Sequence, residues 1–173
     1  MIKYLITSAV AVALGMVLWS CNTSGCTENQ NSLPLAGFYI DSDSLGVRAV
    51  TVDSLEVGGV GAPNDSLLVT SKESVSMVYL PFRSSADRSS FYFNVVSSLS
   101  IAPLATDTVT FSYTSTPYFA SEDCGAVFYY HIDRVSYTRH FIDSIAVTDS
   151  LITNVDAERI KIFLRTNQSE PAL

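Results

Sequence analysis

The histidines and nearby carboxylates are the side chains whose types and spacing could serve acid–base chemistry or metal binding. His131 and Asp133 are two residues apart, and His140 follows them. On an extended strand His131 and Asp133 would share a face, where an imidazole and a carboxylate could form an acid–base pair or ligate a metal ion. We interpret the three residues instead as incidental polar groups on a solvated strand face, and we expect no metal and no cofactor.

Nucleophilic and phosphate-binding motifs give no further support for catalysis. Serine is abundant, but the Gly-x-Ser-x-Gly elbow of one hydrolase class is absent. Gly58, Gly59 and Gly61 are too scattered for a phosphate loop and do not precede a helical pattern, so they predict a bend or bulge between strands. The sequence therefore predicts no catalytic residue.

Thiol chemistry is indicated near the N-terminus. Residues 1–20 carry one charge, Lys3, followed by an apolar run and the small residue Ser20, and Cys21 comes next. This order is typical of a secretory signal peptide. A membrane-spanning helix is a weaker interpretation, because the run is short and no basic residue follows it until Arg48.

The stretch Leu18-Trp19-Ser20-Cys21 resembles the bacterial lipobox, in which an aliphatic and a small residue precede a cysteine that receives diacylglycerol. Trp19 departs from that pattern, because a small or β-branched residue is usual there. The resemblance implies that Cys21 is acylated, and two or more acyl chains hold a protein firmly on a membrane. The alternative is a plain secreted protein cleaved near Ser20.

Two cysteines, Cys26 and Cys124, remain if Cys21 is acylated. Export would place them in an oxidising compartment, where a disulfide is more expected than two free thiols. The bond would close a loop of about a hundred residues and, in the chain-entropy model, contribute up to ~4–5 kcal/mol to stability. A metal site is the alternative, but two further ligands at sensible spacing are missing.

One tripeptide recurs, in which an aspartate precedes serine or threonine and then an aliphatic residue. Its hydroxyl-bearing residues are Ser44, Ser54, Ser66, Thr108, Ser144 and Ser150. In one interpretation, the first two residues bond to their own backbone at a turn and the aliphatic residue opens the next strand. In the other, the pattern resembles the O-glycan acceptor of exported proteins in some Gram-negative bacteria. Both can hold together, since exposed turns present their hydroxyls.

Strand patterns dominate the chain after the apolar run, so we expect β-strands to position the histidines, carboxylates and hydroxyl groups described above. Val109, Phe111 and Tyr113 alternate with hydroxyl residues, as a half-buried strand requires. Residues 91–95 and 160–164 alternate in the same way. Further predicted strands are 35–40, 48–52, 55–60, 67–70, 75–80, 126–132 and 145–147. Short strands at roughly ten-residue intervals predict one all-β domain, an antiparallel β-sandwich or flattened barrel.

The domain organisation follows from these patterns. We expect a signal peptide over residues 1–20, a lipidated N-terminus and tether over 21–33, the β-sandwich over 34–165 and a flexible tail over 166–173. Removal of Lys3 would leave 9 basic and 17 acidic residues, a net charge of −8. Nucleic acid and anionic lipid head groups are unfavourable partners for such a chain.

The tyrosines allow two interpretations. Tyr79, Tyr92, Tyr113, Tyr118, Tyr129, Tyr130 and Tyr137 could form a surface that stacks sugars or binds protein. Tyrosine is also common in β-strands for its strand propensity alone, and we favour that interpretation.

Several motifs in order resemble a domain-of-unknown-function family of small bacterial lipoproteins. They are Cys26-Thr27 before a strand ending in Phe38-Tyr39, the segment 107–114, Phe119-Ala120-Ser121 before Cys124-Gly125, and Ile152-Thr153-Asn154 before Lys161-Ile162. The resemblance spans most of residues 26–164. It implies a lipid-tethered exported domain with a Cys26–Cys124 pairing, but no reaction and no catalytic residue.

We therefore expect a non-catalytic interaction or structural module of the cell envelope. Its anchor would be the N-terminal lipid, at the outer membrane. The residues after Cys21 lack the acidic run that resembles a surface-export signal, so the periplasmic face is favoured over the cell surface. The expected partner is an envelope protein or a glycan. A glycan-binding accessory lipoprotein is the alternative function, and a hydrolase with an unrecognised site is the third.

Overall fold

The computed structural model describes residues 31–42, 46–97, 104–122 and 125–165, and strands dominate them. In chain order the strands are β1 (Leu35–Ser42), β2 (Gly46–Ala49), β3 (Leu55–Gly59), β4 (Leu67–Val69), β5 (Met77–Tyr79), β6 (Arg88–Val95), β7 (Ala105–Ser121), β8 (Gly125–Tyr137), β9 (Ile142–Val147), β10 (Leu151–Ile152) and β11 (Glu158–Leu164). A 3-10 turn, η1 (Pro63–Asp65), connects β3 to β4. In this part of the chain no helix is long and apolar enough to span a membrane.

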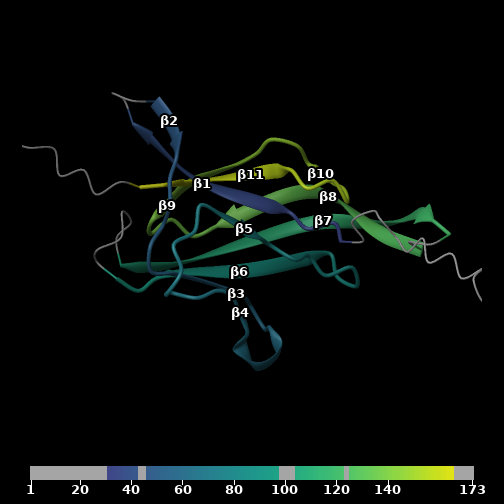
Figure 1. Ribbon diagram of the computed structural model, residues 1–173, viewed down its shortest axis with the longest axis horizontal. Coiled ribbons are helices and arrows are strands. Elements are labelled where there is room, and N and C mark those ends of the chain that lie inside the picture. The colour runs from purple at the N-terminus through teal and green to yellow at the C-terminus, as the bar shows by residue number, and fades with distance from the viewer. Residues whose placement is uncertain (1–30, 43–45, 98–103, 123–124, 166–173) are drawn as a thin grey trace, which may run out of the picture.

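The strands form two sheets, which confirms the predicted all-β sandwich. One sheet has the order β2-β1-β11-β9, with β5 also paired to β1, and the other has the order β10-β8-β7-β6-β3-β4. Neither sheet closes into a barrel over the described residues. The two layers and the long β7 and β8 strands are visible in Figure 1.

One strand pair departs from the predicted antiparallel arrangement. Of the nine pairs among the described residues, eight are antiparallel, but β1 and β11 run parallel. Parallel neighbours need a long crossover. Here the chain forms the whole second sheet between leaving β1 and returning as β11, so the first and last strands of the domain lie side by side.

The core is built by the predicted alternation. Val109, Phe111 and Tyr113 of β7 are all buried, and so are the alternating apolar residues of β6 and β11. Across the core, Phe38 of β1 meets Phe93 of β6 edge to face, with ring centroids 6.3 Å apart. Aromatic pairs of this geometry stabilise packing beyond the area they bury, so this contact helps to hold the two sheets together.

The predicted bend near the glycines is confirmed in β3. Its pairing with β4 shifts register between Val57 and Gly58. A methyl group on Gly58 would lie 2.5 Å from the Tyr92 hydroxyl oxygen, so only glycine fits without movement of that ring. The shift leads β3 into the turn that carries η1.

The β7–β8 hairpin is longer than the sequence pattern indicated. Pairing runs from Val109↔Tyr137 to Ser121↔Gly125. The hairpin extends beyond the ends of the other strands in Figure 1. Its outer half was not recognised because residues 114–117 are polar or proline and show no apolar alternation. This projection places a second set of side chains away from the core.

Candidate functional site

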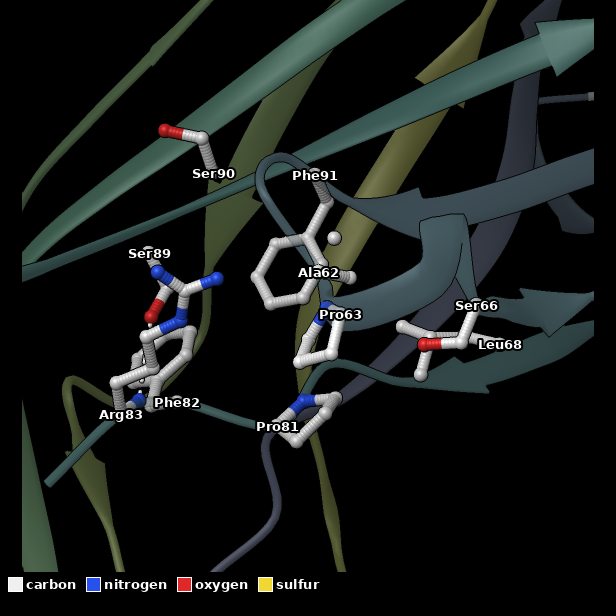
Figure 2. Close-up of a pocket in the computed structure, with 11 residues that line it drawn as sticks. Ala62, Pro63, Ser66, Leu68, Pro81, Phe82, Arg83, Ser89, Ser90 and Phe91 are labelled. Atoms are coloured by element: carbon white, nitrogen blue, oxygen red, sulfur yellow. Dashed lines mark hydrogen bonds between the residues drawn. The ribbon is translucent and has the colours of Figure 1, made fainter.

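An apolar pocket of about 280 Å³ opens between the β3–β4 turn and the segment that follows β5. Its lining residues are Gly59, Ala62, Pro63, Ser66, Leu68, Pro81, Phe82, Arg83, Ser89, Ser90 and Phe91. In Figure 2 the rings of Phe91, Pro63 and Pro81 occupy the centre, with Arg83 on one side and Leu68 on the other. The pocket therefore combines an apolar lining with a single guanidinium.

Buried hydroxyl groups fix the segment that forms one wall of this pocket. The Arg83 backbone N–H donates to the Tyr113 hydroxyl over 2.9 Å, and that hydroxyl in turn bonds to the Arg83 carbonyl oxygen over 2.9 Å. Ser89 Oγ lies 2.8 Å from the same hydroxyl. The Phe82 ring stacks on the Tyr113 ring with centroids 4.4 Å apart. Residues 82 and 83 are therefore held in place although they belong to no strand.

A second hollow of about 400 Å³ adjoins the pocket. It shares Leu68 and Pro81 with it and also borders on Met77 and Tyr79. Met77 is 50% exposed and Leu68 is 40% exposed. We call the two hollows together the apolar groove. Contiguous exposed apolar surface of this kind marks interaction sites in soluble domains.

Arg83 stands at the mouth of the groove in a fixed position. Its Nη2 donates to the carbonyl oxygens of Val60 and Gly61 over 3.2 and 3.3 Å. Both acceptors belong to the turn after β3, so the guanidinium links the two walls. The guanidinium can pair with a carboxylate at this end of the groove, whereas Glu73 lines the second hollow.

The tyrosines do not form one continuous stripe. Tyr113 and Tyr130 are buried, whereas Tyr118 is exposed on the outer part of the hairpin. Tyr118 stacks on Tyr129 with centroids 4.5 Å apart and an interplanar angle of 14°. The Tyr129 hydroxyl donates to Asn154 Oδ1 over 3.0 Å. A pair of stacked, near-parallel rings beside a side-chain amide is thus presented on the projecting hairpin.

The three residues singled out for acid–base chemistry separate into two groups. His131 Nδ1 lies 3.1 Å from Asp133 Oδ1, as their predicted shared face requires. His140 is not with them, because its Nδ1 lies 2.9 Å from Asp107 Oδ1. His131 Nε2 instead meets Ser150 Oγ at 3.2 Å. The described residues contain no group of three or more His, Cys, Asp or Glu placed to hold a metal ion.

Asp107 is a buried carboxylate that organises the β8–β9 connection. Its oxygens accept from the backbone N–H groups of His140, Phe141 and Ile142 and from Thr138 Oγ1, at 2.6 to 3.1 Å. Burial raises the pKa of this carboxyl, but the hydrogen bonds from Ile142, Thr138, His140 and Phe141 outweigh it and leave the pKa below its ordinary value. Asp107 is therefore a charged structural group.

A family model described as a family of unknown function, DUF6452, matches residues 54–164, which is more than half of the chain. The chain belongs to the DUF6452 family. The DUF6452 match begins just before β3 and ends with β11, so it includes the groove, the hairpin and Asp107. It covers less of the N-terminal side than the resemblance stated from the sequence, and β1 and β2 precede it. No match was found among curated proteins or among solved structures.

Some of the modification sites predicted for this DUF6452 chain lie among the described residues and some do not. Cys21, Cys26, Ser44 and Cys124 lie outside the described residues. In three of the recurring tripeptides, Leu55, Leu67 and Leu151 each open a strand, as the turn interpretation predicts.

Two tripeptides do not follow that interpretation. Thr108 lies within β7 and Ser144 within β9, so the turn interpretation was wrong for both. Asp107 and Asp143, the aspartates of these two tripeptides, lie inside paired strands, so neither begins a turn before a strand.

Sequence reasoning missed the residues that form the apolar pocket of the DUF6452 domain. Phe82 and Arg83 fall in a loop without periodicity, so no pattern marked them. Asp107 could have been found, because it lies two residues before Val109 and so shares the buried face of that strand.

Proposed function

We propose that this DUF6452 protein is a lipid-anchored interaction module of the cell envelope, tethered through acylated Cys21 at the outer membrane. The support is the order of basic start, apolar run and small residue before Cys21, together with the lipobox resemblance. We further propose a Cys26–Cys124 disulfide. Since Ser121 and Gly125 pair at the end of the hairpin, this bond would fix the tether to the end of β7 and β8.

The apolar groove is the proposed contact surface, and its paired hollows are the observation that carries the proposal. Two neighbouring hollows of about 280 and 400 Å³ share Leu68 and Pro81. Arg83 at the mouth complements an acidic group. The proposed partner is an envelope protein that inserts apolar side chains beside a carboxylate. Such anchors in pockets supply most of the affinity at protein interfaces.

Site-specific photocrosslinking tests this surface in intact cells. A photoreactive residue at position 68 is expected to give a discrete adduct, because Leu68 borders both hollows. The matched control carries the same residue at position 47, since Val47 is 53% exposed on β2 of the other sheet. Adducts of equal yield at both positions, or none at position 68, would exclude the groove as the contact surface.

Glycan binding is a second candidate function, favoured by the stacked pair Tyr118 and Tyr129. The exposed Tyr118 ring, backed by the half-buried Tyr129 ring, offers an apolar face on which a sugar ring can stack, and Asn154 beside the pair can hydrogen-bond hydroxyl groups. The proposed ligand is an envelope oligosaccharide.

Replacement of Tyr118 by alanine is expected to weaken oligosaccharide binding by about two- to tenfold, since a stacked aromatic contact contributes roughly 0.5–1.5 kcal/mol beyond the area it buries. The only tryptophan is Trp19, so tyrosine emission reports binding directly in the processed chain. Tyr79→Ala is the control, because Tyr79 is also exposed but lies on β5. Equal affinities of the two variants would remove the stacked pair as a glycan site.

A further inference from the structure

Ser150, His131 and Asp133 form a hydrogen-bonded chain on the surface of the second sheet. Ser150 Oγ lies 3.2 Å from His131 Nε2, and His131 Nδ1 lies 3.1 Å from Asp133 Oδ1. With the imidazole neutral and its hydrogen on Nδ1, that nitrogen donates to the carboxylate and Nε2 accepts from the serine hydroxyl. A nucleophile within reach of a base that a third group orients is the recognisable arrangement of covalent acyl transfer.

The backbone holds Ser150 beside the imidazole. The Ile132 N–H donates to the Ser150 carbonyl oxygen over 2.8 Å, and β10 pairs with β8 so that Leu151 stands opposite His131. On the other side of Ser150, Asp149 accepts from the Leu151 N–H over 2.9 Å and forms an ion pair with Arg159 of β11. The backbone of Ser150 is therefore held by its pairing with β8 and by the contacts of Asp149.

Asp133 is positioned by an irregularity in the β7–β8 ladder. Pairing passes from Ser112↔Arg134 to Tyr113↔Ile132, so Asp133 is the extra residue of a bulge. Bulges redirect side chains and are common beside active sites. Thr114 Oγ1 donates to Asp133 Oδ2 over 3.1 Å and leaves Oδ1 for the imidazole.

A hollow of about 480 Å³ adjoins this chain of residues. Its lining mixes polar and aliphatic side chains, namely Ile132, Asp133, Arg134, Val135, Val147, Thr148, Asp149 and Ser150, and His131 adjoins it through Asp133 and Ser150. Among the eight described residues on its lining, Arg134 alone is cationic. The side chain of His131 is 57% exposed, so a substrate can reach it from solvent. The hollow is an open depression beside Ser150, so an ester can approach its hydroxyl from solvent.

We infer that Ser150 is the nucleophile of an esterase activity toward short-chain carboxylic esters, with His131 as general base and Asp133 as its positioning residue. Ser150 Oγ bonds to the ester carbonyl carbon while its proton passes to His131 Nε2. The bond from that carbon to the alcohol oxygen then breaks, and the alcohol takes the proton. Water adds to the acyl carbon and gives a proton to Nε2, the bond to Oγ breaks, Oγ regains the proton, and the carboxylic acid leaves.

A serine that acts as a nucleophile must keep its hydroxyl free. Ser150 is therefore expected to be unmodified in the native protein, whatever the occupancy of Ser54, Ser66 or Ser144.

Hydrolysis of 4-nitrophenyl acetate and butyrate by the full mature chain tests the activity. Ser150→Ala and His131→Gln are each expected to lower the rate at least about a hundredfold, the low end of what a positioned base contributes. Ser136→Ala is the control, since Ser136 is an exposed serine on β8, the strand that carries His131 and Asp133. A fluorophosphonate probe should label Ser150 in the parent chain and in the Ser136 variant only.

Three results would overturn the inference. The first is a rate in the parent chain no higher than that of Ser150→Ala. The second is a probe adduct that maps to another residue. The third is a native peptide in which Ser150 is fully glycosylated. Unchanged circular dichroism of the Ser150 and His131 variants distinguishes loss of the nucleophile from loss of the fold.

Discussion

Replacement of Asp107 by alanine is expected to lower the free energy of unfolding by about 3–5 kcal/mol. The carboxylate is fully buried and accepts three backbone N–H groups and one hydroxyl from residues 138–142. Alanine would leave the N–H groups of Phe141 and Ile142 without their acceptor inside the protein. Urea unfolding of the processed chain, followed by circular dichroism at neutral pH, measures the loss.

Acid should reproduce part of this effect in the parent chain. Since the folded-state pKa of Asp107 lies below its unfolded value, its contribution is fully present above the unfolded pKa. It is lost as the pH falls through the folded pKa, which places the change below about pH 4. The Asp107→Asn variant should lack this component of the pH dependence.

Asp143→Asn is the matched control for Asp107. Asp143 is an exposed aspartate that pairs with Arg139 and Arg165 over 3.7 and 3.5 Å. Exposed ion pairs contribute roughly 0–1 kcal/mol, so this variant should unfold within about 1 kcal/mol of the parent chain. If Asp107→Ala were equally mild, Asp107 would not be the group that holds the β8–β9 connection.

Substitution of Cys21 by serine is expected to abolish fatty-acid incorporation and to deplete the protein from the outer-membrane fraction. A serine cannot form the thioether to diacylglycerol, and each buried acyl methylene contributes about 0.8 kcal/mol to membrane binding. Processing of residues 1–20 should change with it. Metabolic labelling with an alkyne fatty acid, followed by membrane fractionation, measures both effects.

Cys26→Ser separates the two proposed cysteine roles. This variant should incorporate the fatty acid and stay in the membrane fraction, but it should lose the bond to Cys124. Persistent labelling and unchanged fractionation of Cys21→Ser would contradict the anchor.

The sequence predicted the faces of the core better than it predicted their assembly. Alternation placed Val109, Phe111 and Tyr113 together because side-chain direction in a strand is a local property. The direction of pairing is not local, so the parallel contact between β1 and β11 could not be read from either strand alone. The same applies to the outer half of the hairpin, whose residues pair through their backbone without an apolar pattern.

The candidate sites were also predictable only where their residues are close in the sequence. His131 and Asp133 are close in sequence, and spacing alone predicted that they share a strand face. The contact of His131 with Ser150 spans nineteen residues and depends on the register of β10 on β8, which no motif encodes. The apolar groove depends on Phe82, whose carbonyl oxygen accepts from the Tyr130 hydroxyl and whose ring stacks on the Tyr113 ring.

Mass spectrometry of the protein purified from its native membrane tests the lipid-anchored module most directly. The account predicts a chain that begins at Cys21 and carries acyl groups on that residue, with a peptide in which Cys26 and Cys124 are cross-linked. A chain that retains residues 1–20, or that begins at residue 21 with no fatty acid, would contradict it.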